Sequence, residues 1–161
     1  MENKSAREVC VEAVDMIVSF ERMHRIGSDG RVYPYHDMVG YPTIGIGHLL
    51  SKVKYEDLSK YDSMTLEEAH ELHVEDLNKF ATGVENLVTS DISDNEFGAL
   101  VSLAFNIGLG NLKTSTLLRK LNAGMSKDEV SVEFPKWNRA GGAEVRGLTR
   151  RRLAEKELFL A

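Results

Sequence analysis

Two carboxylates and one hydroxyl could perform acid–base chemistry in this chain of 161 residues. Glu21 follows an apolar segment, and Asp37 and Thr43 stand in the stretch YPYHDMVGYPTIGIGH, which is rich in glycine and proline. Glycoside hydrolysis needs one protonated carboxyl group to protonate the leaving oxygen, and an ionised one that attacks or holds a water molecule. A threonine hydroxyl donates and accepts hydrogen bonds, so Thr43 could help to fix that water. With 25 acidic residues in the chain, each carboxylate could equally be a solvated charge, and Asp37 a turn former.

A helix and a hairpin would have to position these residues. Apolar residues recur at helical spacing over about Ala6–Met23, which puts Glu21 in the last turn of the predicted helix. From about Arg31–Ile46 the residues are aromatic and β-branched and lack this period. They predict two strands joined by a tight turn that ends at Gly40.

The rest of the chain reads as helical. Ser or Thr followed three residues later by Glu predicts helix starts at Thr65, Ser93 and Ser126. Gly124 marks a helix end, and the last helix is expected over about Thr149–Leu160. We therefore predict one α+β domain over residues 1–161. It would have a small β lobe at about residues 31–48, a helical lobe formed by the remainder, and a cleft between them.

Composition and net charge argue against several classes of function. The net charge of -5 argues against nucleic-acid binding, no apolar run is long enough to cross a membrane, and the N-terminal stretch lacks the apolar core of a signal peptide. The single cysteine, Cys10, excludes an internal disulfide and is expected to be a small buried apolar residue.

Several other residues and motifs are candidates for a role, and most of them allow more than one interpretation. His70 and His73, three residues apart on a predicted helix, could hold a metal, but a solvated helix face is favoured because no third ligand is evident. His48 is a candidate to attach the hairpin to the helical part. The basic stretch RGLTRRR, Arg146–Arg152, is either a solvated helix start or a groove edge that meets carboxylates. Trp137, the only tryptophan, is expected in the core rather than as a sugar platform.

Several segments together resemble the bacteriophage lysozymes, the endolysin muramidases of tailed phages. They are SFER, YPTIGIGHLLS, LVSLAFNIGLGNLKTSTLLRKLNAG and FPKWNRAGGAEVRGLTRRRLAEKELF, in the family's order. The resemblance implies a lysozyme-like fold and inverting hydrolysis of the β-1,4 bond between N-acetylmuramic acid and N-acetylglucosamine, without metal or organic cofactor. It implies that Glu21 is the general acid, Asp37 the second carboxylate and Thr43 a residue that orients water. The positions of Leu49, Phe105 and Thr116 match substrate contacts of the family.

The chain departs from the family in two places. Arg22 stands where glycine normally follows the glutamate, and fifteen residues separate Glu21 from Asp37 because of an extra segment, RIGSDGR. Asp29 in that segment lies at nearly the usual distance from the glutamate. Asp37 keeps the family's order of Asp, Gly, Thr and Ile-Gly-x-Gly-His, and a hairpin orients a side chain better than a loop does, so Asp37 is favoured over Asp29.

The expected partner is therefore the glycan strand of peptidoglycan, with no nucleic acid, no stable membrane insertion and a monomeric chain. We expect the protein to be made in the host cytoplasm and to reach the wall through a separate membrane pore. A lytic transglycosylase and a wall-binding module without turnover remain the alternatives.

Overall fold

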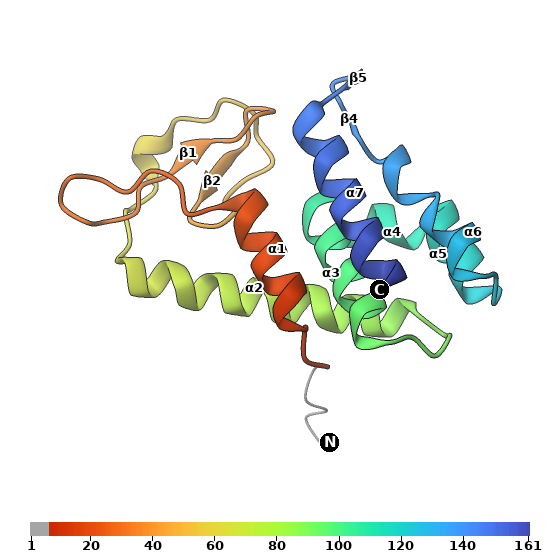
Figure 1. Cartoon of the computed structure of the whole chain (residues 1–161). Coiled ribbons are helices and arrows are strands. Elements are labelled where there is room, and N and C mark those ends of the chain that lie inside the picture. The colour runs from red at the N-terminus through yellow and green to blue at the C-terminus, as the bar shows by residue number, and fades with distance from the viewer. Residues whose placement is uncertain (1–6) are drawn as a thin grey trace. The chain divides into compact units, whose positions relative to one another are not determined.

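The computed structural model describes residues 7–161 (Figure 1). The α-helices are α1 (Val11–Glu21), α2 (Leu66–Leu87), α3 (Asp94–Ile107), α4 (Leu109–Lys113), α5 (Thr116–Asn122), α6 (Lys127–Ser131) and α7 (Arg146–Leu160), with 3-10 turns η1 (Leu58–Lys60) and η2 (Phe134–Lys136). The strands are β1 (Tyr35–His36), β2 (Pro42–Ile44), β3 (His48–Leu49), β4 (Arg139–Ala140) and β5 (Ala143–Glu144). Helices with small antiparallel sheets confirm the predicted α+β class.

The chain divides into two compact units. One is Val18–Asp76, and the other combines residues 7–17 with Leu77–Ala161. Both α1 and α2 contribute residues to each unit.

The larger unit is built around α3. Apolar side chains of α3 such as Phe97, Leu100 and Leu103 are fully buried, and α7 packs along this helix (Figure 1). Ser93 and Glu96 form the predicted capping box. Trp137 and Cys10, both expected in the core, are each partly buried and pack against it.

Helix α7 holds a buried charge cluster that corrects both interpretations of the basic stretch for Arg151 and Arg152, whereas Arg146 and Arg150 are exposed, as a solvated helix start predicts. The helix begins at Arg146, before the predicted Thr149, and Arg151 and Arg152 are 3% and 0% exposed. Neither side chain belongs to a solvated face or a groove edge. The Nε of Arg152 lies 2.7 Å from Oε1 of Glu155, and Glu155 is itself 0% exposed.

Two further contacts complete this cluster. Arg151 Nε donates to Glu155 Oε2 at 3.3 Å, and the Ser102 hydroxyl of α3 donates to the same oxygen at 2.5 Å. Arg151 Nη2 also donates to the Ser102 carbonyl at 3.0 Å. The cluster therefore joins α7 to α3 through charged groups, as buried charges require partners.

The smaller unit contains a three-stranded antiparallel sheet in the order β1-β2-β3. The predicted hairpin and its turn at Gly40 are confirmed, since Gly40 N–H donates to the Asp37 carbonyl at 3.0 Å. The prediction missed β3, which has only two residues, His48 and Leu49, and begins one residue after Gly47. It also missed the β4–β5 hairpin of the larger unit. Strands this short carry no alternation that could reveal them.

Packing against α2 stabilises this sheet. Val32, Ile44 and Ala69 form its buried core. His48 Nδ1 lies 2.7 Å from Oδ2 of Asp76 on α2, which is the kind of attachment expected for His48. On the same helix His70 is exposed, as predicted, but His73 is 7% exposed, so the prediction of a solvated face is wrong for His73.

Candidate active site

Asp37 begins the turn between β1 and β2, and its side chain organises that turn. Its Oδ1 accepts hydrogen bonds from the backbone N–H groups of Val39, Gly40 and Tyr41, at 2.9, 2.9 and 2.8 Å. These bonds form because aspartate can accept from backbone groups two to four residues ahead. One carboxylate oxygen thus fixes the orientation of the other, Oδ2, which these three bonds do not use.

Thr43 lies on the central strand of the sheet. It pairs with Tyr35 of β1 on one side and with Leu49 of β3 on the other, so these three residues form one row across the sheet. The Thr43 hydroxyl donates to the Tyr41 carbonyl at 2.8 Å. Because its only proton is engaged there, the Thr43 oxygen can serve as an acceptor toward a third group.

Glu21 is the last residue of α1 and is half-buried. The next residue, Arg22, has a φ of 47°, which is the left-handed region that favours glycine. This explains why a glycine in this place suits the chain reversal after the helix. Arg22 adopts the same reversal with a side chain, at the cost of backbone strain.

We therefore expect Arg22→Gly to stabilise the protein by about 0.5–1 kcal/mol, because relief of left-handed strain exceeds the added flexibility of the unfolded chain. Urea unfolding would measure the change. Arg22→Ala is the matched control: it also removes the 3.3 Å bond from Arg22 Nε to the Ser19 carbonyl but keeps the Cβ. Equal stability of the two variants would contradict the strain argument.

The extra segment after Glu21 is an ordered small hairpin. Tyr33 N–H donates to the Arg25 carbonyl at 3.0 Å, and Gly27 N–H to the Arg31 carbonyl at 2.8 Å. Val32 also pairs with Met64, which ties the hairpin to the chain ahead of α2.

Asp29 has a local role in this hairpin. Its carboxylate accepts from the Tyr33 hydroxyl and from Arg31 N–H, and the hydrogen bond from Tyr33 lowers the pKa of Asp29. Asp29 is exposed, and the interactions described for it lie within its own hairpin. These contacts favour Asp37 over Asp29 as the second carboxylate.

The charges of Glu21 and Asp37 both affect the pKa of Tyr35. Burial, followed by the charges of Glu21 and Asp37, raises the pKa of Tyr35 to about 12. The charges of both carboxylates therefore act on the same phenol group. The sequence analysis missed Tyr35, although its position two residues before Asp37 puts the two on the same side of an extended chain.

Helix α2 adds a second group near Glu21. Burial lowers the pKa of His73, while the charges of Asp76 and, to a smaller extent, Glu21 raise it. The imidazole of His73, which lies close enough to Glu21 to feel its charge, therefore favours its neutral form.

The remaining predicted site residues are distributed over both units. Leu49 belongs to the smaller unit with Glu21, Asp37 and Thr43 and is 43% exposed. Phe105 and Thr116 belong to the larger unit. Phe105 is half-buried against Phe80, with the two ring centroids 5.2 Å apart. Thr116 is exposed at the start of α5.

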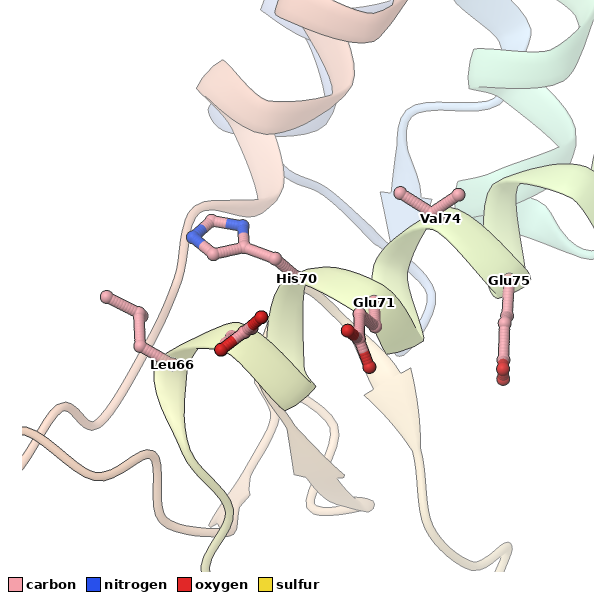
Figure 2. A pocket seen from close by; sticks show the side chains of 6 residues that line it. Leu66, His70, Glu71, Val74 and Glu75 are labelled. Carbon is pink, nitrogen blue, oxygen red and sulfur yellow. The ribbon is translucent and has the colours of Figure 1, made fainter.

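A pocket lies on the exposed face of α2, apart from these residues (Figure 2). It is lined by Leu66, Glu67, His70, Glu71, Val74 and Glu75. In Figure 2 His70 and Val74 project to one side of the helix in this view, and Glu71 and Glu75 to the other. None of the predicted site residues lines this pocket.

Among residues 7–161 no group of three or more His, Cys, Asp or Glu side chains is arranged to hold a metal ion. Within the same residues, no helix has the length and apolar character needed to span a membrane.

Comparison with known proteins identifies relatives among phage proteins. Residues 28–155 match the family model described as phage lysozyme, a range that includes Asp37 and Thr43 and begins after Glu21. The endolysin of Bacillus phage B103 is 40% identical over 147 residues, which is 91% of this chain and 52% of the relative. The endolysin of Salmonella phage P22 is 37% identical over 131 residues, or 81% of this chain and 88% of the relative. The chain spans about half the length of the two Bacillus phage endolysins that it matches, 52% and 55%.

Solved structures agree with this assignment. The muramidase domain of SpmX from Asticaccaulis excentricus matches with a TM-score of 0.76 and 30% identity, over 96% of this chain and 99% of that one. A mutant of P22 lysozyme matches with a TM-score of 0.72 and 30% identity, with the same coverage. The predicted lysozyme-like fold is thereby confirmed. By sequence and by fold, the chain belongs to the phage lysozyme family.

Proposed function

We propose that this protein is a phage endolysin that hydrolyses the β-1,4 bond between N-acetylmuramic acid and N-acetylglucosamine in peptidoglycan. The observation that carries the proposal is the grouping of Glu21, Asp37 and Thr43 within one compact unit, with both carboxylates acting on Tyr35. Two carboxyl groups with a hydroxyl that can orient water are the groups that glycoside hydrolysis requires.

The proposed reaction gives each of these three side chains one role. Glu21, as general acid, gives its proton to the glycosidic oxygen as the bond to the anomeric carbon breaks. A water molecule attacks that carbon from the opposite face and loses a proton to Oδ2 of Asp37, which Oδ1 holds in place through its turn. The same water donates its other hydrogen to the Thr43 oxygen, whose own proton is engaged by Tyr41. The product sugar is inverted, and solvent restores both protonation states.

Product analysis tests this proposal. Mass spectrometry of sacculi digested by the protein should find reducing N-acetylmuramic acid ends, since water is the nucleophile. Products with only anhydro-muramic ends would instead identify a lytic transglycosylase, and binding to sacculi without released fragments would identify a module without turnover.

The site of action that we propose is the bacterial cell wall, reached from the host cytoplasm through a membrane pore formed by another protein. Relatives from Bacteriophage PS119 and Enterobacteria phage P21 are named SAR-endolysins, so the route of release needs its own test. Cells that express the chain alone should keep their turbidity until a pore-forming protein is induced. Lysis without that protein would contradict the proposed route.

A further inference from the structure

The turn that carries Asp37 needs support from outside its own hairpin. Its flanking strands β1 and β2 have only two and three residues, and Met38 at the tip of the turn is 74% exposed. Strands this short form few ladder hydrogen bonds, and an isolated hairpin is only marginally stable in water. The three bonds to Asp37 Oδ1 order the turn from within, but they do not hold it against the rest of the unit.

Tyr55 and Glu56 lie against this turn and provide such support. Tyr55 N–H donates to the Gly40 carbonyl at 2.7 Å. A β-carbon at position 40 would lie 2.7 Å from Cε1 of Tyr55, so the tyrosine ring covers the backbone of Gly40. The rings of Tyr55 and His36 meet edge to face with centroids 6.1 Å apart, and His36 Nε2 donates to the Glu56 carbonyl at 2.8 Å. The two residues therefore contact the chain both before and after the turn.

This supporting segment is itself fixed in place. The Glu56 carboxylate forms an ion pair with Lys60 and accepts from the Tyr61 hydroxyl at 3.1 Å, which attaches the segment to the 3-10 turn η1. Tyr55 has a φ of 58°, a left-handed conformation that costs energy for a residue with a side chain. Strain of this kind persists only where the surrounding contacts impose it, and it is often found beside functional sites.

We propose that Tyr55 is a positioning residue of the candidate site, whose ring and N–H hold the turn so that Asp37 Oδ2 stays where it can take a proton from water. Tyr55 acts through Gly40 and has no chemical step of its own. Misplacing a catalytic group by about 1 Å can cost up to about 10²-fold in rate, and a looser turn would spread Oδ2 over such positions. This inference rests on the proposed function, because it gives Asp37 the role of base.

The test compares Tyr55→Gly with wild type in two readouts. Glycine removes the ring and the left-handed strain together, so the urea unfolding midpoint should stay close to that of wild type. With soluble glycan fragments of peptidoglycan as substrate, kcat should fall by about 10-fold while KM changes by less than about 2-fold, because the lost contact orients a reacting group rather than binding the sugar. In the protein without substrate, the N–H groups of Gly40 and Tyr41 should exchange with deuterium about 10-fold faster, because the turn opens more often.

Val53→Gly is the matched control. It places the same flexible residue in the same loop, at a side chain that is 60% exposed, so kcat and amide exchange should equal those of wild type. Tyr55→Phe keeps the ring and should rescue both readouts. If Tyr55→Gly unfolds, Tyr55→Asn provides a second variant without the ring, because asparagine tolerates the left-handed conformation.

The possible outcomes separate this inference from the proposed function. Unchanged exchange at Gly40 and Tyr41 in Tyr55→Gly, an unchanged kcat, or equal losses in Val53→Gly would each overturn the role of Tyr55 and leave the function intact, as long as wild type releases reducing ends. Wild-type products with only anhydro-muramic ends would instead overturn the proposed function, whatever the amide exchange of Tyr55→Gly.

Discussion

Replacing Glu21 with glutamine should slow the release of reducing sugar ends from purified sacculi by about 10²–10⁴-fold, the range that a positioned general acid contributes. Glutamine has nearly the shape of glutamate but cannot supply a proton to the leaving oxygen. Because Glu21 ends α1 at a half-buried position, the substitution should leave the unfolding midpoint close to that of wild type. A reducing-sugar assay together with urea unfolding would separate lost chemistry from lost folding.

The two candidate second carboxylates provide the comparison for this experiment. Asp37→Asn should also reduce the rate strongly, because its amide oxygen can still accept the N–H bonds of Val39, Gly40 and Tyr41 but no group remains to take a proton from water. Asp29→Asn should keep nearly full activity, since the contacts of Asp29 lie within the extra hairpin. The reverse result, an active Asp37→Asn and an inactive Asp29→Asn, would assign the role to Asp29.

The second large effect is on stability. Glu155→Gln should lower the free energy of unfolding by about 3–5 kcal/mol, because it removes the buried carboxylate charge that lies 3.3 Å from Arg151 Nε and 2.7 Å from Arg152 Nε. Arg151 and Arg152 are only 3% and 0% exposed, so water cannot replace the carboxylate unless α7 moves away from its neighbours. Urea denaturation followed by circular dichroism would measure the loss.

Glu144→Gln is the matched control for this prediction. Glu144 also faces an arginine, Arg139 at 3.8 Å, but both side chains are more than 60% exposed (61% and 69%). Exposed ion pairs contribute about 0–1 kcal/mol, so this variant should unfold near the wild-type midpoint. Equal losses in the two variants would mean that burial does not set the energy of the Glu155 cluster.

Helix boundaries could be predicted where a local hydrogen bond defines them. Ser93 and Ser126 start helices with capping boxes, and Gly124 follows the end of α5 with a φ of 77°. Each signal depends on residues a few positions apart, so it is visible in the sequence. The start of α7 lacks a side-chain cap, and there the prediction was three residues late.

The burial of charged residues could not be predicted from the sequence. Arg151, Arg152 and His73 are all buried, and Arg151 has a partner far along the chain, the carbonyl group of Ser102. A basic stretch in an acidic chain gives no sign of such a partner. Asp37 and Thr43 could be proposed from the sequence because the turn and the strand that hold them are formed by neighbouring residues. Tyr35 could not, because its position opposite Thr43 is known only from the pairing of β1 with β2.

The extra hairpin has a consequence for comparing members of this family. The hairpin begins at Arg25 and ends at Tyr33, and a 3.0 Å hydrogen bond from Tyr33 N–H to the Arg25 carbonyl joins its two ends. Residues between these points add length to the sequence but almost no displacement along the path from Glu21 to Asp37. Evolution can therefore lengthen or shorten this segment without moving either carboxylate, so a count of residues from Glu21 does not locate the carboxylate at the turn between β1 and β2.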